Sequence, residues 1–88
     1  MAVWGLDIEQ VRQLAKDLDQ KASDIDNILS TLTSRLSGTQ WTGPDSEKFR
    51  SDWSGQYTSA LKQVSQGLRD AAQRANQNAA DQETVSNA

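Results

Sequence analysis

Residues 40–49 read Gln-Trp-Thr-Gly-Pro-Asp-Ser-Glu-Lys-Phe and contain the only proline of the chain, Pro44. The long stretches on either side have no proline and carry apolar residues at helical spacing. Glycine adopts backbone conformations that side chains forbid, and proline suits the first turn of a helix but not its interior. A turn is therefore expected at residues 38–44, between Gly38 and Pro44. So short a connection lets two helices fold back antiparallel.

The first helix is expected over residues 7–37, with Asp7 as its N-cap. Its apolar residues follow alternating steps of three and four, which is the heptad pattern of a helix that buries one stripe against a neighbour. Leu14 and Ile28 lie beside this stripe and widen it. The stripe consists of Ile8, Val11, Ala15, Leu18, Ala22, Ile25, Leu29, Leu32 and Leu36.

The second helix is expected over residues 44–79, with Phe49 as the first residue of its buried stripe. The bulky side chains lie near its start, and small or polar ones follow. Residues 81–88 have almost no apolar content and are expected to form a flexible tail, so the hairpin domain covers residues 1–80. The expected stripe is Phe49, Trp53, Tyr57, Ala60, Val64, Leu68, Ala71 and Ala75.

The composition predicts association of the hairpin with a second one. Only 35% of the 88 residues are hydrophobic, and a chain this polar buries little apolar surface alone. The expected fold class is therefore an all-α antiparallel two-helix hairpin that dimerises into a four-helix bundle. The partner is a second copy or a sibling hairpin. The candidate interface residues are Leu14, Ile28, Leu29, Trp53 and Tyr57.

Several function classes are disfavoured by the composition. The chain has no cysteine and no histidine, so we expect no metal site, no cofactor and no enzymatic activity on a small-molecule substrate. Its net charge of −3 is spread over interspersed acids and bases, which argues against nucleic acid as a partner. The first residues lack the basic and apolar regions of a Sec signal peptide. Secretion of this chain would need another route.

The most specific motif is Trp41-Thr42-Gly43, followed by Ser46, Phe49 and Trp53. With its central position in a short, cysteine-free chain, it resembles the WXG-100 (ESAT-6-like) family of small bacterial proteins. The resemblance implies a helical hairpin that pairs with itself or a sibling. It also implies secretion by a type VII (ESX) system with a membrane-bound ATPase, and makes Trp41 and Gly43 the candidate recognition residues. The alternative is an intracellular helical adaptor whose motif is accidental.

The C-terminal part departs from the pattern of this family. Members that carry the export signal often have a tyrosine followed four positions later by an acidic residue, beyond the second helix. Here the only tyrosine is Tyr57, and Leu61 stands four positions after it. The end of the chain offers Asp81, Glu83 and Val85 instead. Either these residues form a variant export signal, or a partner with the usual signal carries this chain.

Overall fold

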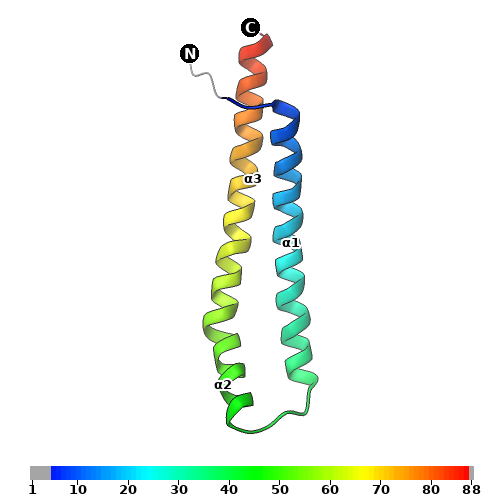
Figure 1. Ribbon diagram of the computed structural model, residues 1–88, viewed down its shortest axis with the longest axis vertical. Coiled ribbons are helices and arrows are strands. Elements are labelled where there is room, and N and C mark those ends of the chain that lie inside the picture. The colour runs from blue at the N-terminus through cyan, green and yellow to red at the C-terminus, as the bar shows by residue number, and fades with distance from the viewer. Residues whose placement is uncertain (1–4, 88) are drawn as a thin grey trace.

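The computed structural model describes residues 5–87 and shows an all-α antiparallel hairpin (Figure 1). The first arm is α1 (Ile8–Gly38). The second arm consists of α2 (Pro44–Asp52), η1 (Trp53–Tyr57) and α3 (Thr58–Asn87), which follow one another without a break. The molecule is a rod with extents of 65 × 18 × 13 Å. The predicted hairpin is confirmed.

The ends of α1 are set by local hydrogen bonds. The Asp7 carboxylate accepts from the backbone N–H of Gln10 at 2.9 Å and so caps a free amide of the first turn. At the other end the Thr39 hydroxyl donates to the Arg35 carbonyl at 2.5 Å. The helix begins and ends one residue later than the expected range of 7–37.

The stripe of α1 that faces the second arm follows the heptad pattern. Ala15, Ala22 and Leu29 are buried, and most of the other predicted residues are half-buried. Leu32 is the exception, because its side chain is exposed. The hydrophobic periodicity of the first helix thus predicted which side of α1 packs against the second arm.

The second arm contains a π-helical turn at Trp53–Tyr57, where one regular helix was expected. The Trp53 carbonyl accepts from the backbone N–H of Thr58, five residues later, and from the Thr58 hydroxyl at 2.5 Å. A π turn adds one residue to the helical repeat. All residues of α3 are therefore rotated relative to a continuous α-helix.

This rotation makes part of the predicted stripe of the second arm wrong, beginning with Tyr57, which is 42% exposed. Ala60, Val64 and Ala71 were expected to be buried, but all three are exposed. The stripe that faces α1 contains instead the residues that follow these three, while the predicted Leu68 and Ala75 remain in it and are half-buried. Its members are Leu61, Ser65, Leu68, Ala72, Ala75 and Ala79.

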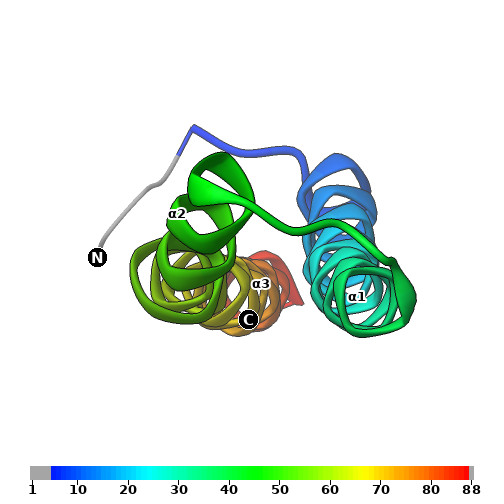
Figure 2. The ribbon, with the colours of Figure 1, turned by 90° about the horizontal axis from the view of Figure 1, so that it is seen from below.

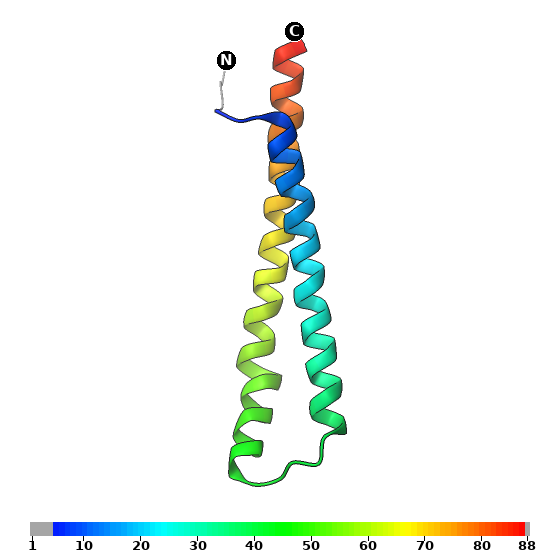
Figure 3. The same ribbon diagram turned by 45° about the vertical axis from the view of Figure 1, so that its right-hand side comes forward.

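The two arms lie side by side when the rod is viewed from its turn end (Figure 2). They run close together at the open end and diverge toward the turn (Figures 1 and 3). Small side chains explain the close approach. Four alanines are almost completely buried between the arms: Ala15 and Ala22 of α1, and Ala72 and Ala79 of α3. The larger Leu29 and Trp53 fill the wider end. The rod is therefore tapered.

Polar contacts close one side of the seam between α1 and α3. Arg12 forms a salt bridge with Glu83 at 2.9 Å, and Arg69 forms one with Asp26 at 2.6 Å. Ser65 is buried between the arms, and its hydroxyl donates to Asp26 Oδ1 at 2.8 Å and accepts from Arg69 Nη1 at 2.6 Å. These bonds join positions far apart in the chain, so they help to set the register of the arms.

The end of α3 differs from the expected flexible tail. The helix was expected to end near residue 79, but residues 81–87 continue it to Asn87. Three contacts stabilise this extension. Ala79 is fully buried, Glu83 is held by Arg12, and the Gln77 amide donates to Asp81 at 2.8 Å. Position 88 lies outside the described residues.

We predict that Gly67→Ala stabilises the protein. Gly67 lies within α3 in an exposed position, and an added Cβ meets nothing within 4 Å. Alanine restricts the unfolded chain and favours helix, so the free energy of unfolding should rise by about 0.5–1 kcal/mol. Urea denaturation measures this change. Gly43→Ala is the control and should lower stability, because Gly43 has a φ of 121°. A loss of stability in Gly67→Ala would contradict the prediction.

We also predict a loss of stability in acid that depends on Asp26. Hydrogen bonds from Arg69 and then Ser65 hold the pKa of the Asp26 carboxyl below its ordinary value. The unfolded state therefore takes up a proton more readily than the folded state. The stabilisation is present above the unfolded pKa of about 4 and is lost as the pH falls through the lower folded pKa.

Denaturation of Asp26→Asn measured between about pH 6 and pH 2 tests this prediction. The variant should be less stable than the wild type at pH 6 and should lose less stability on acidification. Asp19→Asn is the matched control, because Asp19 forms no ion pair within residues 5–87. Equal pH dependence of Asp26→Asn and wild type would show that this pair does not couple to folding.

Candidate functional site

The turn between α1 and α2 is built around Gly43. Its φ of 121° and ψ of 174° suit glycine alone, and its carbonyl accepts from the Glu47 N–H at 3.0 Å. Pro44 occupies the first position of α2, where its missing N–H costs nothing. Asp45 and Glu47 add negative charge at the positive end of the helix. Gly43, Pro44, Asp45 and Glu47 are thus suited to the end of the turn and the start of α2.

Ser46 and Arg50 tie the turn to the end of α1. The buried Ser46 hydroxyl donates to the Trp41 carbonyl at 2.7 Å and accepts from Arg50 Nε at 2.9 Å. The other guanidinium nitrogens of Arg50 donate to the carbonyls of Leu36 at 2.5 Å and Thr39 at 3.1 Å. One cation therefore satisfies carbonyls that the helix end leaves free.

Arg50 was missed by the sequence analysis. Its signal was present, because it stands four residues after Ser46 and so shares one face of α2 with it. Ser46 lies on the same helix, but the other two acceptors are carbonyls of α1 and of the turn, and only the folded hairpin brings these to Arg50. Ser46 was predicted as a motif residue, and its hydroxyl links Arg50 to the Trp41 carbonyl.

Trp53 belongs to the interior of its own hairpin. Its side chain is 7% exposed, and its indole Nε1 donates to the Thr33 hydroxyl at 3.0 Å. Leu29 is buried beside it at the wider end of the rod. Both were expected at an intermolecular surface. That expectation is wrong, because contacts between the arms already cover them.

Three exposed aromatic side chains gather near the turn. Phe49 is central, with ring centroids 6.3 Å from Trp41, 6.2 Å from Trp53 and 6.4 Å from Tyr57. Trp41 is 42% exposed and Phe49 37% exposed, so Phe49 does not begin a buried stripe as expected. The π turn contributes to this cluster because it rotates Tyr57 away from the seam. Trp41, Phe49 and Tyr57 form the aromatic patch.

The two sides of the seam differ in chemistry. Arg12 and Asp26 each follow a seam residue by four positions, and both face the salt-bridge side. Leu14 and Ile28 each directly precede a buried seam residue, which places them on the opposite side. Leu14 is 53% exposed and Ile28 49% exposed.

The second arm repeats this division. Val64 directly precedes the buried Ser65, whereas Arg69 follows it by four positions and faces the salt-bridge side. Tyr57 likewise directly precedes the half-buried Thr58. One long side of the rod therefore carries exposed apolar side chains from both arms. The apolar face comprises Leu14, Ile28, Leu32, Phe49, Tyr57 and Val64.

The candidate export residues near the C-terminus lie on α3. Asp81 accepts from Gln77, and Glu83 is engaged by Arg12, whose hydrogen bond and charge hold the pKa of the Glu83 carboxyl below its ordinary value. Val85 is half-buried. The structure therefore presents these three residues in helical form, with one of the two carboxylates tied to α1.

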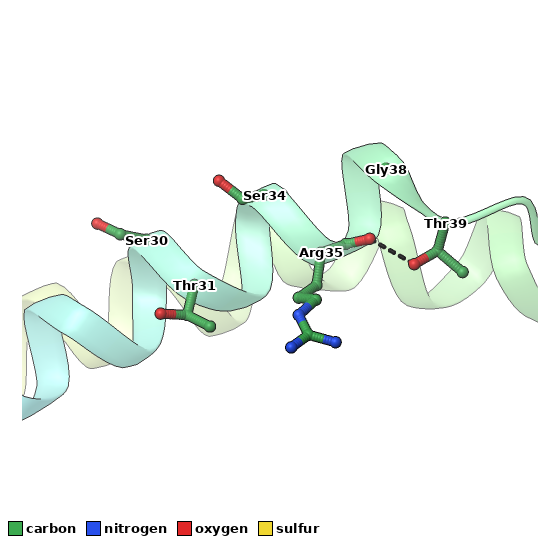
Figure 4. A pocket seen from close by; sticks show the side chains of 6 residues that line it. All are labelled: Ser30, Thr31, Ser34, Arg35, Gly38 and Thr39. Carbon is green, nitrogen blue, oxygen red and sulfur yellow. Dashed lines mark hydrogen bonds between the residues drawn. The ribbon is translucent and has the colours of Figure 1, made fainter.

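We next consider the surface of residues 5–87 as a place for a small ligand or an ion. A shallow groove at the end of α1 carries several hydroxyl groups (Figure 4). In that view the Ser30 and Ser34 hydroxyls point away from the Arg35 guanidinium, so they do not converge. No cluster of metal-ligating side chains occurs among the described residues. Within residues 5–87 no helix has both the length and the apolarity that crossing a membrane requires.

Comparison with known proteins places the chain in a family. Neither the curated proteins nor the solved structures give a match. The family model described as WXG100, proteins of 100 residues with WXG, matches residues 6–85. The match includes both arms, the turn with Trp41 and Gly43, and nearly all of α3. The chain therefore belongs to the WXG100 family.

Proposed function

We propose that this protein is secreted through a type VII system as a homodimer and acts by protein–protein interaction. Membership of the WXG100 family makes it a small helical protein of the type VII substrate class. Members of the family pair with one another in general and are not enzymes. The observation that carries the proposal is the asymmetry of the rod, with salt bridges on one side and the apolar face on the other.

The apolar face supports association through the hydrophobic effect. Fully burying one large aliphatic side chain contributes about 1.5–3 kcal/mol. Leu14 and Ile28 are about half exposed, and Val64 is exposed on the neighbouring helix. In a twofold-symmetric dimer each interface position contributes a side chain from both copies, so its contribution counts twice. Covering this face with the same face of a second copy would produce the four-helix bundle, while the salt-bridge sides stay in water.

Trp41, the residue of the aromatic patch that is not part of the apolar face, is proposed as the residue that the secretion machinery reads. The turn beneath it is held by backbone carbonyls, Ser46 and Arg50, and these bonds do not use the indole ring of Trp41. The ring is partly exposed on a rigid support. This arrangement suits contact with the membrane-bound secretion ATPase, because binding would not require the turn to be ordered first.

The C-terminal residues of α3 are proposed as the second part of the export signal. In a dimer of inverted rods, residues 71–85 of one copy lie beside the turn of the other. Asp81, Glu83 and Val85 would then neighbour the Trp41 and Gly43 of the second copy. A signal composed of both parts would be complete only in the dimer, and a sibling with the usual tyrosine signal would not be needed.

The dimer is tested with Ile28→Ala. Each dimer loses two partly buried isoleucine side chains, so we expect the dissociation constant to rise at least about a hundredfold. Analytical ultracentrifugation over a range of concentrations measures it. Ile25→Ala is the control within the same helix, because half-buried Ile25 belongs to the seam and should mainly lower the melting temperature. A wild-type protein that stays monomeric at micromolar concentration would refute the homodimer.

The recognition role is tested by separating export from folding. Trp41→Ala removes an exposed ring, so we expect a small change in melting temperature and a large loss of secreted protein. Arg50→Ala and Gly43→Val should instead destabilise the fold, since Arg50 holds the helix end and Gly43 has a φ of 121°. Thermal melts and immunoblots of culture supernatants give both readouts. Strong destabilisation by Trp41→Ala would contradict the recognition role.

A further inference from the structure

One charged side chain interrupts the apolar surface of α1. We consider the residues of α1 that lie at the seam, or next to it, on the side of the apolar face. From Val11 to Leu32, Lys21 is the only charged residue among these positions. Its ammonium lies 3.4 Å from the Asp24 carboxylate on the same helix. The full set is Val11, Leu14, Leu18, Lys21, Ile25, Ile28 and Leu32.

Lys21 stands at the midpoint of this set. Leu14 lies seven residues before it, and Ile28 lies seven residues after it. Suppose two rods stack with their apolar faces together and point in opposite directions. The twofold axis then lies in the interface, across the rods, and stacks α1 on α1 of the second copy. With the axis beside Lys21, Leu14 meets Ile28 of the second copy.

The shape of the rod favours this inverted stacking. The turn end is wide and carries the exposed aromatic patch, whereas the open end is narrow and lined by alanines. Two rods stacked in the same direction would place both bulky ends together and leave the narrow ends apart. Inverting one rod puts the aromatic end of each over the narrow end of the other, so contact extends along the whole length.

We propose that Lys21 and Asp24 form a self-complementary charge pair that straddles the twofold axis and selects a second copy of this chain as partner. This inference rests on the proposed dimer. Three residues of helix span about 4.5 Å, so the long side chain of each lysine reaches Asp24 of the other copy. The four charges then alternate and sum to zero. A sibling hairpin with a different charge at either position would leave charges unmatched.

The experiment uses one charge reversal at a time in the full-length chain. Lys21→Glu makes all four groups at the axis acidic, and Asp24→Lys makes all four basic. Each variant alone should show a dissociation constant raised at least about tenfold over wild type, because like charges oppose one another across the interface. Mixing the two variants in equal amounts should restore a dimer that contains one chain of each, detected by native mass spectrometry.

Two controls separate this pairing from a change in net charge or folding. Lys16→Glu and Asp70→Lys make the same changes of charge at exposed positions away from the apolar face, and each should dimerise like wild type. Circular dichroism shows whether each variant keeps its helix. The double variant Lys21→Glu with Asp24→Lys reverses both charges and should dimerise with itself.

The outcomes distinguish this inference from the proposed function. If the wild type dimerises but both single variants retain its dissociation constant, the axis does not lie beside Lys21 and only the inference falls. Single variants that are monomeric both alone and in the mixture would also overturn it, since no charge match is restored. A monomeric wild type would instead overturn the proposed dimer itself.

Discussion

The π turn at Trp53–Tyr57 adds one residue to the second arm, and the arrangement of all of α3 depends on it. At the first position of this turn, the buried Trp53 donates from its indole to the Thr33 hydroxyl of α1. Beyond it, Ser65, Ala72 and Ala79 face α1, whereas a continuous α-helix would present the residues one position earlier. The extra residue also turns Tyr57 outward, next to Phe49. The Thr58 hydroxyl bonds the Trp53 carbonyl and helps to stabilise the widened turn.

The tapered seam and its two unlike sides follow from this register. Buried alanines bring α1 and α3 together at the open end, and Leu29 and Trp53 hold them apart near the turn. On one side of the seam the register aligns Arg12 with Glu83 and Asp26 with Arg69. On the other side lie exposed apolar residues of both arms, with Lys21 among those of α1. A single hairpin therefore has one side with salt bridges and one side with exposed apolar side chains.

In the turn, the residues that hold the backbone differ from the residue whose side chain is exposed. Arg50 bonds the carbonyls of Leu36 and Thr39 and the hydroxyl of Ser46, so the helix end and the turn are held by polar contacts. The Trp41 ring contacts Phe49 but forms none of these bonds. Gly43 supplies the backbone conformation of the turn, and the Trp41 side chain is partly exposed beside it.

The sequence by itself determined the hairpin, the turn and the buried side of α1, because these follow from local rules. Pro44 and Gly43 interrupt the helix through backbone sterics, and an unbroken heptad pattern marks one stripe of a regular helix. Trp41 and Gly43 were also found as motif residues, and the family model confirms the family they indicate. The tertiary structure alone decided the register of α3, the helical state of residues 81–87 and the role of Arg50. Each depends on contacts between the arms, such as Trp53 with Thr33 and Arg12 with Glu83, which no local spacing encodes.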